Sequence, residues 1–187
     1  MTDEFNYLIT FISVLVGLGM TNLLHSLHLI LKARKLITWN WVPLAWAFIA
    51  FESLIIMWFN LKIELTSFYS ESVLGLLLFL APTVCHLLFV MAVLPDETPQ
   101  EKLDLKSWYF DQTKYLFSLT SIMMVLLFIN RVVADKVSMY TFFTNVMFIG
   151  ISILLSRSKR YSLHAIVVII VLILMHIGII LPLINNV

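Results

Sequence analysis

Apolar residues run through this chain in six long stretches separated by short polar segments. Each stretch is close to the roughly 20 residues that an α-helix needs to cross a bilayer. We therefore expect six transmembrane helices, at residues 7–31, 41–61, 72–94, 110–131, 138–156 and 162–184. No connection between them is long enough to fold as a soluble domain. The predicted fold is a single all-α membrane domain over residues 1–187.

Polar residues within the first stretch recur every three or four positions. At about 100° per residue on an α-helix, eight of them share roughly a third of the circumference, while Asn22 and Ser26 lie apart. We call these eight the α-stripe: Asn6, Thr10, Ser13, Gly17, Thr21, His25, His28 and Lys32. Polar groups in hydrocarbon cost several kcal/mol unless they find partners. We therefore expect the α-stripe to face other helices or a water-filled path.

Composition supports the membrane class. Hydrophobic residues make up 61% of the chain and charged residues 12%, whereas soluble domains carry about 25% charged residues. The net charge of +1 gives no basic face for nucleic acid. The single cysteine, Cys85, excludes an intrachain disulfide and a CxxC redox pair. The first residues carry no cationic segment before the apolar run, so we expect the first span to be retained.

The Lys and Arg residues predict the orientation. With the N-terminus outside, the internal loops and span ends hold nine cations, namely Lys32, Arg34, Lys35, Lys102, Lys106, Lys114, Arg157, Lys159 and Arg160. The external side keeps Lys62, Arg131 and Lys136. Cytoplasmic loops are enriched in Lys and Arg. We therefore expect a protein of the plasma (inner) membrane with both termini outside.

Glu52 is the most informative single residue. It lies near the midpoint of the second span, in the run AFIAFESLIIMW, with no other charge nearby. An acidic residue at the centre of a membrane helix costs about 2.5–3.5 kcal/mol on insertion scales. Glu52 must therefore be protonated, or paired with a cation or a hydrogen-bond donor. Its role is either to handle protons or cations, or to join helices as a neutral acid.

Histidines could complete a polar site around Glu52. His25 and His28 lie in the inner third of span one, His86 near the centre of span three, and His176 near the centre of span six. A neutral imidazole offers one donor and one acceptor. We expect His86 to be the closest partner of Glu52. With Thr21 of the α-stripe, these residues are candidates for a proton or small-ion path.

Other chemistry is less well supported by the sequence. The spacing His25-x-x-His28 is a loose metal pattern, and the predicted depths of the histidines do not match as haem ligands would. We predict no resident cofactor, with haem or a divalent metal as the alternative, and we find no catalytic motif that predicts an enzyme. Asn130 and Arg131 end the fourth span, either as solvated outer polar residues or as an anion site.

The leading hypothesis is therefore a small channel- or transporter-like protein with a polar intramembrane path. Six short helices enclose little room, so we expect a homo-oligomer. The second hypothesis is a membrane anchor, sensor or interaction subunit whose basic inner loops bind a cytoplasmic protein. The third is a haem- or metal-bearing redox subunit.

Overall fold

The chain forms six long helices in the part of the sequence that its computed structural model describes, residues 3–64 and 72–185. Side chains are described for 6–60 and 72–177. The helices are α1 (Asp3–Lys32), α2 (Trp41–Glu64), α4 (Val73–Ala92), α5 (Leu105–Val133), α6 (Met139–Arg157) and α7 (Tyr161–Asn185). Two short strands, β1 (Ile37–Thr38) and β2 (Leu103–Asp104), complete the described elements. The predicted all-helical architecture is confirmed.

Five of the described helices, α1, α2, α4, α5 and α6, are long and apolar enough to cross a membrane. The apolar part of α7 with described side chains, Tyr161–Ile177, is shorter. The helix ends lie within a few residues of the expected spans, and the largest difference is the start of α5. This helix begins at Leu105 because the side chain of Asp104 accepts a hydrogen bond from the Lys106 N–H at 3.0 Å. Such a side chain satisfies one of the free N–H groups at a helix start.

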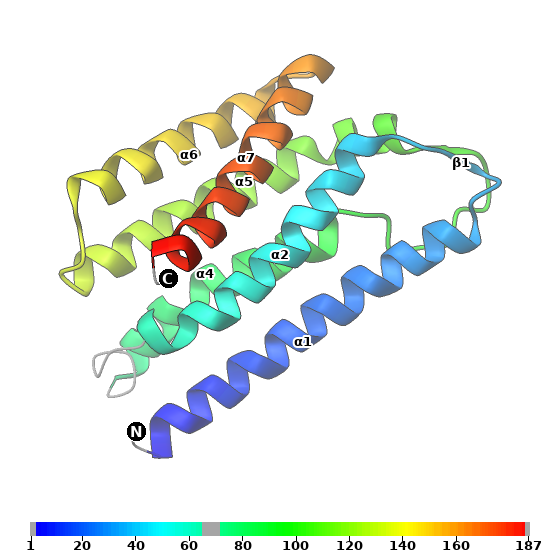
Figure 1. Cartoon of the computed structure of the whole chain (residues 1–187). Coiled ribbons are helices and arrows are strands. Elements are labelled where there is room, and N and C mark those ends of the chain that lie inside the picture. Colours follow the sequence, from blue (N-terminus) through cyan, green and yellow to red (C-terminus); the bar gives the residue numbers. More distant parts are fainter. Residues whose placement is uncertain (1–2, 65–71, 186–187) are drawn as a thin grey trace.

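The helices form an elongated bundle with α1 and α6 at opposite edges (Figure 1). Helix α1 packs against α2 and α4, α5 packs against α4, and α6 packs mainly against α5. Helix α7 lies over α2. The core consists of buried aliphatic and aromatic side chains from α1, α2, α4 and α5, with few contributions from α6 and α7.

Helix α1 enters this core with the face opposite the α-stripe. Its buried positions recur every three or four residues, at Ile12, Val16, Gly19, Leu23, Ser26 and Ile30. Gly19 allows the close approach, because a Cβ there would come within 2.7 Å of the Leu87 side chain. The packed side of α1 is therefore its mainly apolar side.

The three basic loops meet at one end of the bundle, which we call the basic end. Strands β1 and β2 pair in parallel, joining the α1–α2 connection to the α4–α5 connection. The third connection reaches the same place, since Asn40 donates to the Tyr161 hydroxyl and the Lys106 ammonium lies 4.7 Å from the Tyr161 ring centroid. The nine cations that the sequence assigns to one side therefore gather in space as well, and all nine are exposed.

The small sheet was not expected from the sequence. The segment from Pro95 to Lys106 has the composition of a solvated loop, yet Leu103 pairs with Ile37 and Pro95 is buried. Of the three cations at the opposite end, Arg131 and Lys136 have described side chains, and Lys62 lies outside the described side chains.

Candidate functional site

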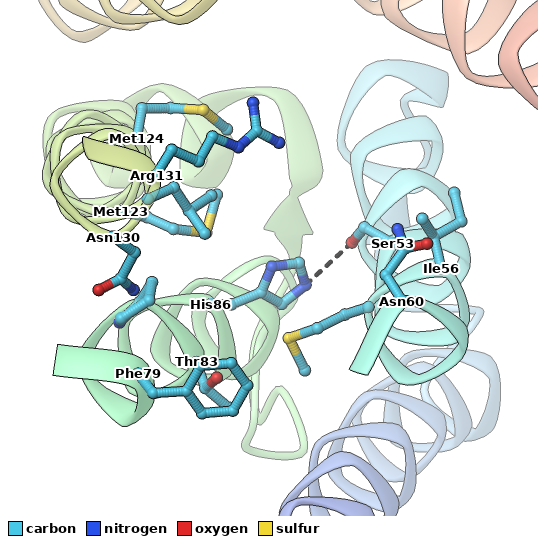
Figure 2. Close-up of a pocket in the computed structure, with 13 residues that line it drawn as sticks. Ser53, Ile56, Asn60, Phe79, Thr83, His86, Met123, Met124, Asn130 and Arg131 are labelled. Carbon is cyan, nitrogen blue, oxygen red and sulfur yellow. Dashed lines mark hydrogen bonds between the residues drawn. The ribbon is translucent and has the colours of Figure 1, made fainter. Parts of the chain in front are cut away.

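A cavity of about 330 Å³ lies between α2, α4 and α5. Toward the basic end these three helices are held together by edge-to-face rings, with Trp46 5.2 Å from Phe117 and 6.4 Å from Phe89 between centroids. Farther along, the facing positions hold small and flexible side chains that leave space unfilled. The lining residues are Ser53, Ile56, Met57, Asn60, Phe79, Pro82, Thr83, His86, Met123, Met124, Leu127, Asn130 and Arg131 (Figure 2).

Pro82 shapes one wall of this cavity. Proline has no backbone N–H, so inside α4 it leaves the carbonyl of Leu78, four residues earlier, without its helical partner. The side-chain amide of Asn130 donates to that carbonyl at 2.9 Å. Asn130, which the sequence left open as a solvated residue or part of an anion site, is buried and joins α5 to the interrupted turn of α4.

His86 places a free acceptor at the cavity. The Ser53 hydroxyl donates to the Ala50 carbonyl at 2.8 Å, so its oxygen accepts from His86 Nε2, which lies 2.9 Å away. In a neutral imidazole Nδ1 is then the acceptor. No described residue donates to this nitrogen, and Figure 2 shows the His86 ring facing the cavity. A bound molecule or water can therefore reach one nitrogen of a buried histidine.

Arg131 lies at the end of the cavity farthest from the basic end. It belongs to the last turn of α5, and its side chain is half-buried along the cavity wall (Figure 2). Within the described part of the chain, Arg131 forms no ion pair, and no carboxylate lines the cavity. The cavity therefore combines an apolar lining with one positive charge.

Glu52 faces away from this cavity, toward α7. Its Oε1 lies 3.4 Å from Nε2 of His176. The expected pairing with His86 is therefore wrong, because Glu52 and Ser53 are neighbours on α2 and point in different directions. His86 bonds to Ser53, and the acid is left to the helix that covers the other side of α2.

The Glu52–His176 contact brings together an acid and an imidazole on neighbouring helices. His176 Nδ1 lies 2.8 Å from the Leu172 carbonyl, which can only accept, so Nδ1 carries a hydrogen. A hydrogen bond at Nε2 would need one further proton, held either by the carboxyl group or by the imidazole. Glu52 Oε2 is buried and has no hydrogen-bond partner among the described residues. An unpaired buried oxygen is less costly on a neutral acid than on a carboxylate.

The α-stripe, in contrast, lies on the outer surface of the chain. Thr21, His25 and His28 are exposed, and a Cβ on Gly17 would meet no atom within 4 Å. The other helices of the chain therefore leave most of the α-stripe uncovered, although the Trp58 indole of α2 donates a hydrogen bond to Ser13 Oγ at 3.0 Å. The hydroxyls of Thr10, Ser13 and Thr21 bond to backbone carbonyls four residues earlier in α1, which provides partners within the helix itself.

The candidate residues thus separate into three regions. His86 lines the cavity, Glu52 and His176 pair between α2 and α7, and Thr21, His25 and His28 lie outside. Sequence reasoning did not connect Ser53 or Thr83 to a site, since single hydroxyl residues in membrane helices are common. Asn22 and Ser26, the two polar residues outside the α-stripe, carry buried oxygens without hydrogen-bond partners in the described chain.

Metal or haem binding gains no geometric support in the described residues. They hold no group of three His, Cys, Asp or Glu side chains close enough to bind a metal ion together. Comparison with known proteins gives no further assignment: no family model, curated protein or solved structure matches this chain.

Proposed function

We propose that this chain is a transporter-like membrane protein that binds a small, mainly apolar molecule in the cavity between α2, α4 and α5. The cavity supports this proposal most directly, because its volume of about 330 Å³ falls in the range of roughly 300–1,000 Å³ typical of ligand sites. Ligand sites also combine an apolar lining with a few polar groups that fix orientation. Here the free nitrogen of His86 and the guanidinium of Arg131 provide such groups.

The experiment is the binding of the neutral fluorophore 1-aminoanthracene to the purified protein in lipid nanodiscs. We expect saturable binding with a fluorescence increase. Met124→Trp should weaken binding at least tenfold, because Met124 lines the cavity and a larger ring would fill it. Val125→Trp is the matched control, since its neighbour Val125 is exposed on the outer side of α5. Equal binding by both variants and the unchanged protein would refute the proposal.

A second candidate function is proton handling at Glu52 and His176. The support is the 3.4 Å separation of Glu52 Oε1 and His176 Nε2, two groups near the middle of their helices. A proton on either partner leaves the pair neutral overall, so the proton can change sides without placing a net charge in hydrocarbon. Glu52 would then handle protons, as the sequence led us to expect, with His176 as its partner in place of His86. The expected proton or small-ion path remains a proposal.

We propose a homo-oligomer in which a second copy covers the α-stripe. The support is that His25 and His28 are exposed and lack a hydrogen-bond partner in the described chain.

For the orientation in the membrane, we propose that the basic end faces the cytoplasm, where anionic lipid or a protein partner would meet its nine exposed cations. Membrane insertion fits the length and composition of the helices. Labelling of single cysteines in a Cys85→Ser background would test the orientation.

A further inference from the structure

The positive charge on the cavity wall distinguishes Arg131 from a comparable arginine elsewhere in the chain. Arg131 and Arg157 both occupy the last turn of a helix, where a cation interacts favourably with the helix dipole. Arg157 is exposed and lies outside this cavity, whereas Arg131 is half-buried and lines the cavity wall. A role at the helix end explains both residues equally, but it does not explain why one of them borders an apolar cavity.

The charge balance of the cavity favours an anion. Arg131 has no carboxylate partner in the described part of the chain, and the remaining polar lining groups are neutral amides, hydroxyls and an imidazole. An arginine can bind a carboxylate or phosphate through two parallel hydrogen bonds. In a partly dry site such a bond is stronger than at an open surface, because the local dielectric constant is lower.

The position of Arg131 also indicates the chemistry of the part of the ligand that lies beyond its charged group. Arg131 lies in the final turn of α5, at the end of the bundle where a helix crossing a bilayer would reach the lipid head groups. From there the cavity runs between the helices toward His86, and Met57, Phe79 and Leu127 are among its lining residues. A molecule with its charge at Arg131 would therefore place an apolar portion against these side chains.

We propose, building on the function assigned to this cavity, that its ligand is an anionic amphiphile whose acidic head group binds Arg131 and whose apolar chain extends toward His86. A carboxylate and a phosphate monoester share the required chemistry. The ligand class is thus a single-chain acid, either a free carboxylic acid or a lipid-derived phosphate. The same cavity would bind a neutral molecule of equal length more weakly.

Calorimetric titration of the nanodisc-bound protein with octanoate, octyl phosphate and octanol tests this class. The three probes share a chain and differ in the head group. We expect one or both acids to bind at least tenfold more tightly than octanol, the ratio expected for a hydrogen bond between charged groups. A preference between the two acids identifies the source as a carboxylic acid or a phosphate lipid. Equal binding of octanol and both acids would overturn the proposal.

Arg131→Gln and Arg157→Gln are the matched variants. Arg131→Gln should reduce acid binding to the level of octanol, while Arg157→Gln should leave it unchanged because Arg157 lies outside the cavity. Equal loss in both variants would show a general charge effect and contradict the proposal. Binding of 1-aminoanthracene by Arg131→Gln confirms an intact cavity. Loss of the acid preference with retained fluorophore binding separates failure of the ligand class from failure of the cavity function.

Discussion

His164 and His86 show two ways in which this bundle places a histidine among packed helices. His164, on α7 near the basic end, is completely buried, and both of its ring nitrogens have partners. Its Nε2 donates to the Ser158 carbonyl at 2.8 Å, and its Nδ1 accepts from the Tyr109 hydroxyl at 2.7 Å. His86 is also buried, but within the described residues only its Nε2 has a partner, and its Nδ1 faces a cavity.

The difference lies in the surroundings of the rings. His164 contacts the rings of Tyr109, Phe110 and Phe117 at centroid distances of 5.4, 5.0 and 5.7 Å, so no space remains beside it. Among the described residues, the His86 ring contacts the ring of Phe89 at a centroid distance of 6.4 Å, and flexible and small side chains line much of the cavity beside it. A histidine with two partners in a filled site fixes helix positions. A histidine with one free nitrogen at a cavity is available to a ligand.

The strongest test of this contrast is Tyr109→Phe. This change removes the hydroxyl that His164 Nδ1 accepts from and leaves that nitrogen buried and unpaired. We expect the free energy of unfolding in detergent to fall by about 1–3 kcal/mol, the usual cost of such a group. Binding of 1-aminoanthracene should stay unchanged in the folded protein. Tyr115→Phe is the control, since Tyr115 is 47% exposed. Equal stability of the two variants would show that the buried hydrogen bond contributes nothing.

A smaller effect on stability is expected at the Glu52–His176 pair. Its imidazole has two partners, as in His164, but it is 49% exposed rather than buried. In Glu52→Gln the amide can still donate to His176 Nε2. We therefore expect a change in stability within about 0.6 kcal/mol, the average for hydrogen bonds between membrane helices. An amide cannot release a proton, so proton flux into liposomes should fall to the level of protein-free vesicles.

Two comparisons make the Glu52 test decisive. Asp111→Asn removes an exposed carboxylate outside the pair and should leave the flux unchanged. Glu52→Leu removes the polar group and its insertion cost, so it should assemble normally but carry no flux. Unchanged flux in Glu52→Gln would remove this residue from any proton path and leave it a role in joining helices.

The sequence predicted the number and approximate ends of the helices because length and hydropathy alone determine them. The gathering of the basic loops also followed, since alternating helix directions place those loops together. The sequence did not predict which side chains on different helices pair with one another. Helical spacing places Glu52 and Ser53 about 100° apart, but it cannot tell which neighbouring helix each one meets. The pairings with His176 and His86 depend on the placement of α7 and α4 around α2.

The surroundings of the α-stripe did not follow from the sequence for a related reason. The periodicity identifies two opposite faces of α1, but the argument that polar residues turn inward assumes that they need partners on other helices. Thr10 and Thr21 instead bond to carbonyls of α1 itself. Close packing against α2 and α4 favours the apolar side, where Gly19 allows contact with Leu87. The cavity could not be predicted either, because it depends on volumes left between three helices.

The smallest effect on the stability of a single chain is expected for His25→Leu. His25 is exposed and has no hydrogen-bond partner among the described residues, which is the extreme opposite of His164. Within one chain the substitution removes no contact and leaves no buried group unpaired, so the free energy of unfolding should change by less than about 0.5 kcal/mol.

If a second copy covers the α-stripe, however, the same change removes a polar group from that interface. We then expect a shift from dimer to monomer in nanodiscs, measured by single-molecule photobleaching. Leu154→Ala, on the exposed face of α6, should leave the oligomeric state unchanged. A monomeric unchanged protein, or a dimer that tolerates His25→Leu, would mean that His25 faces lipid or water and that the α-stripe serves no self-association.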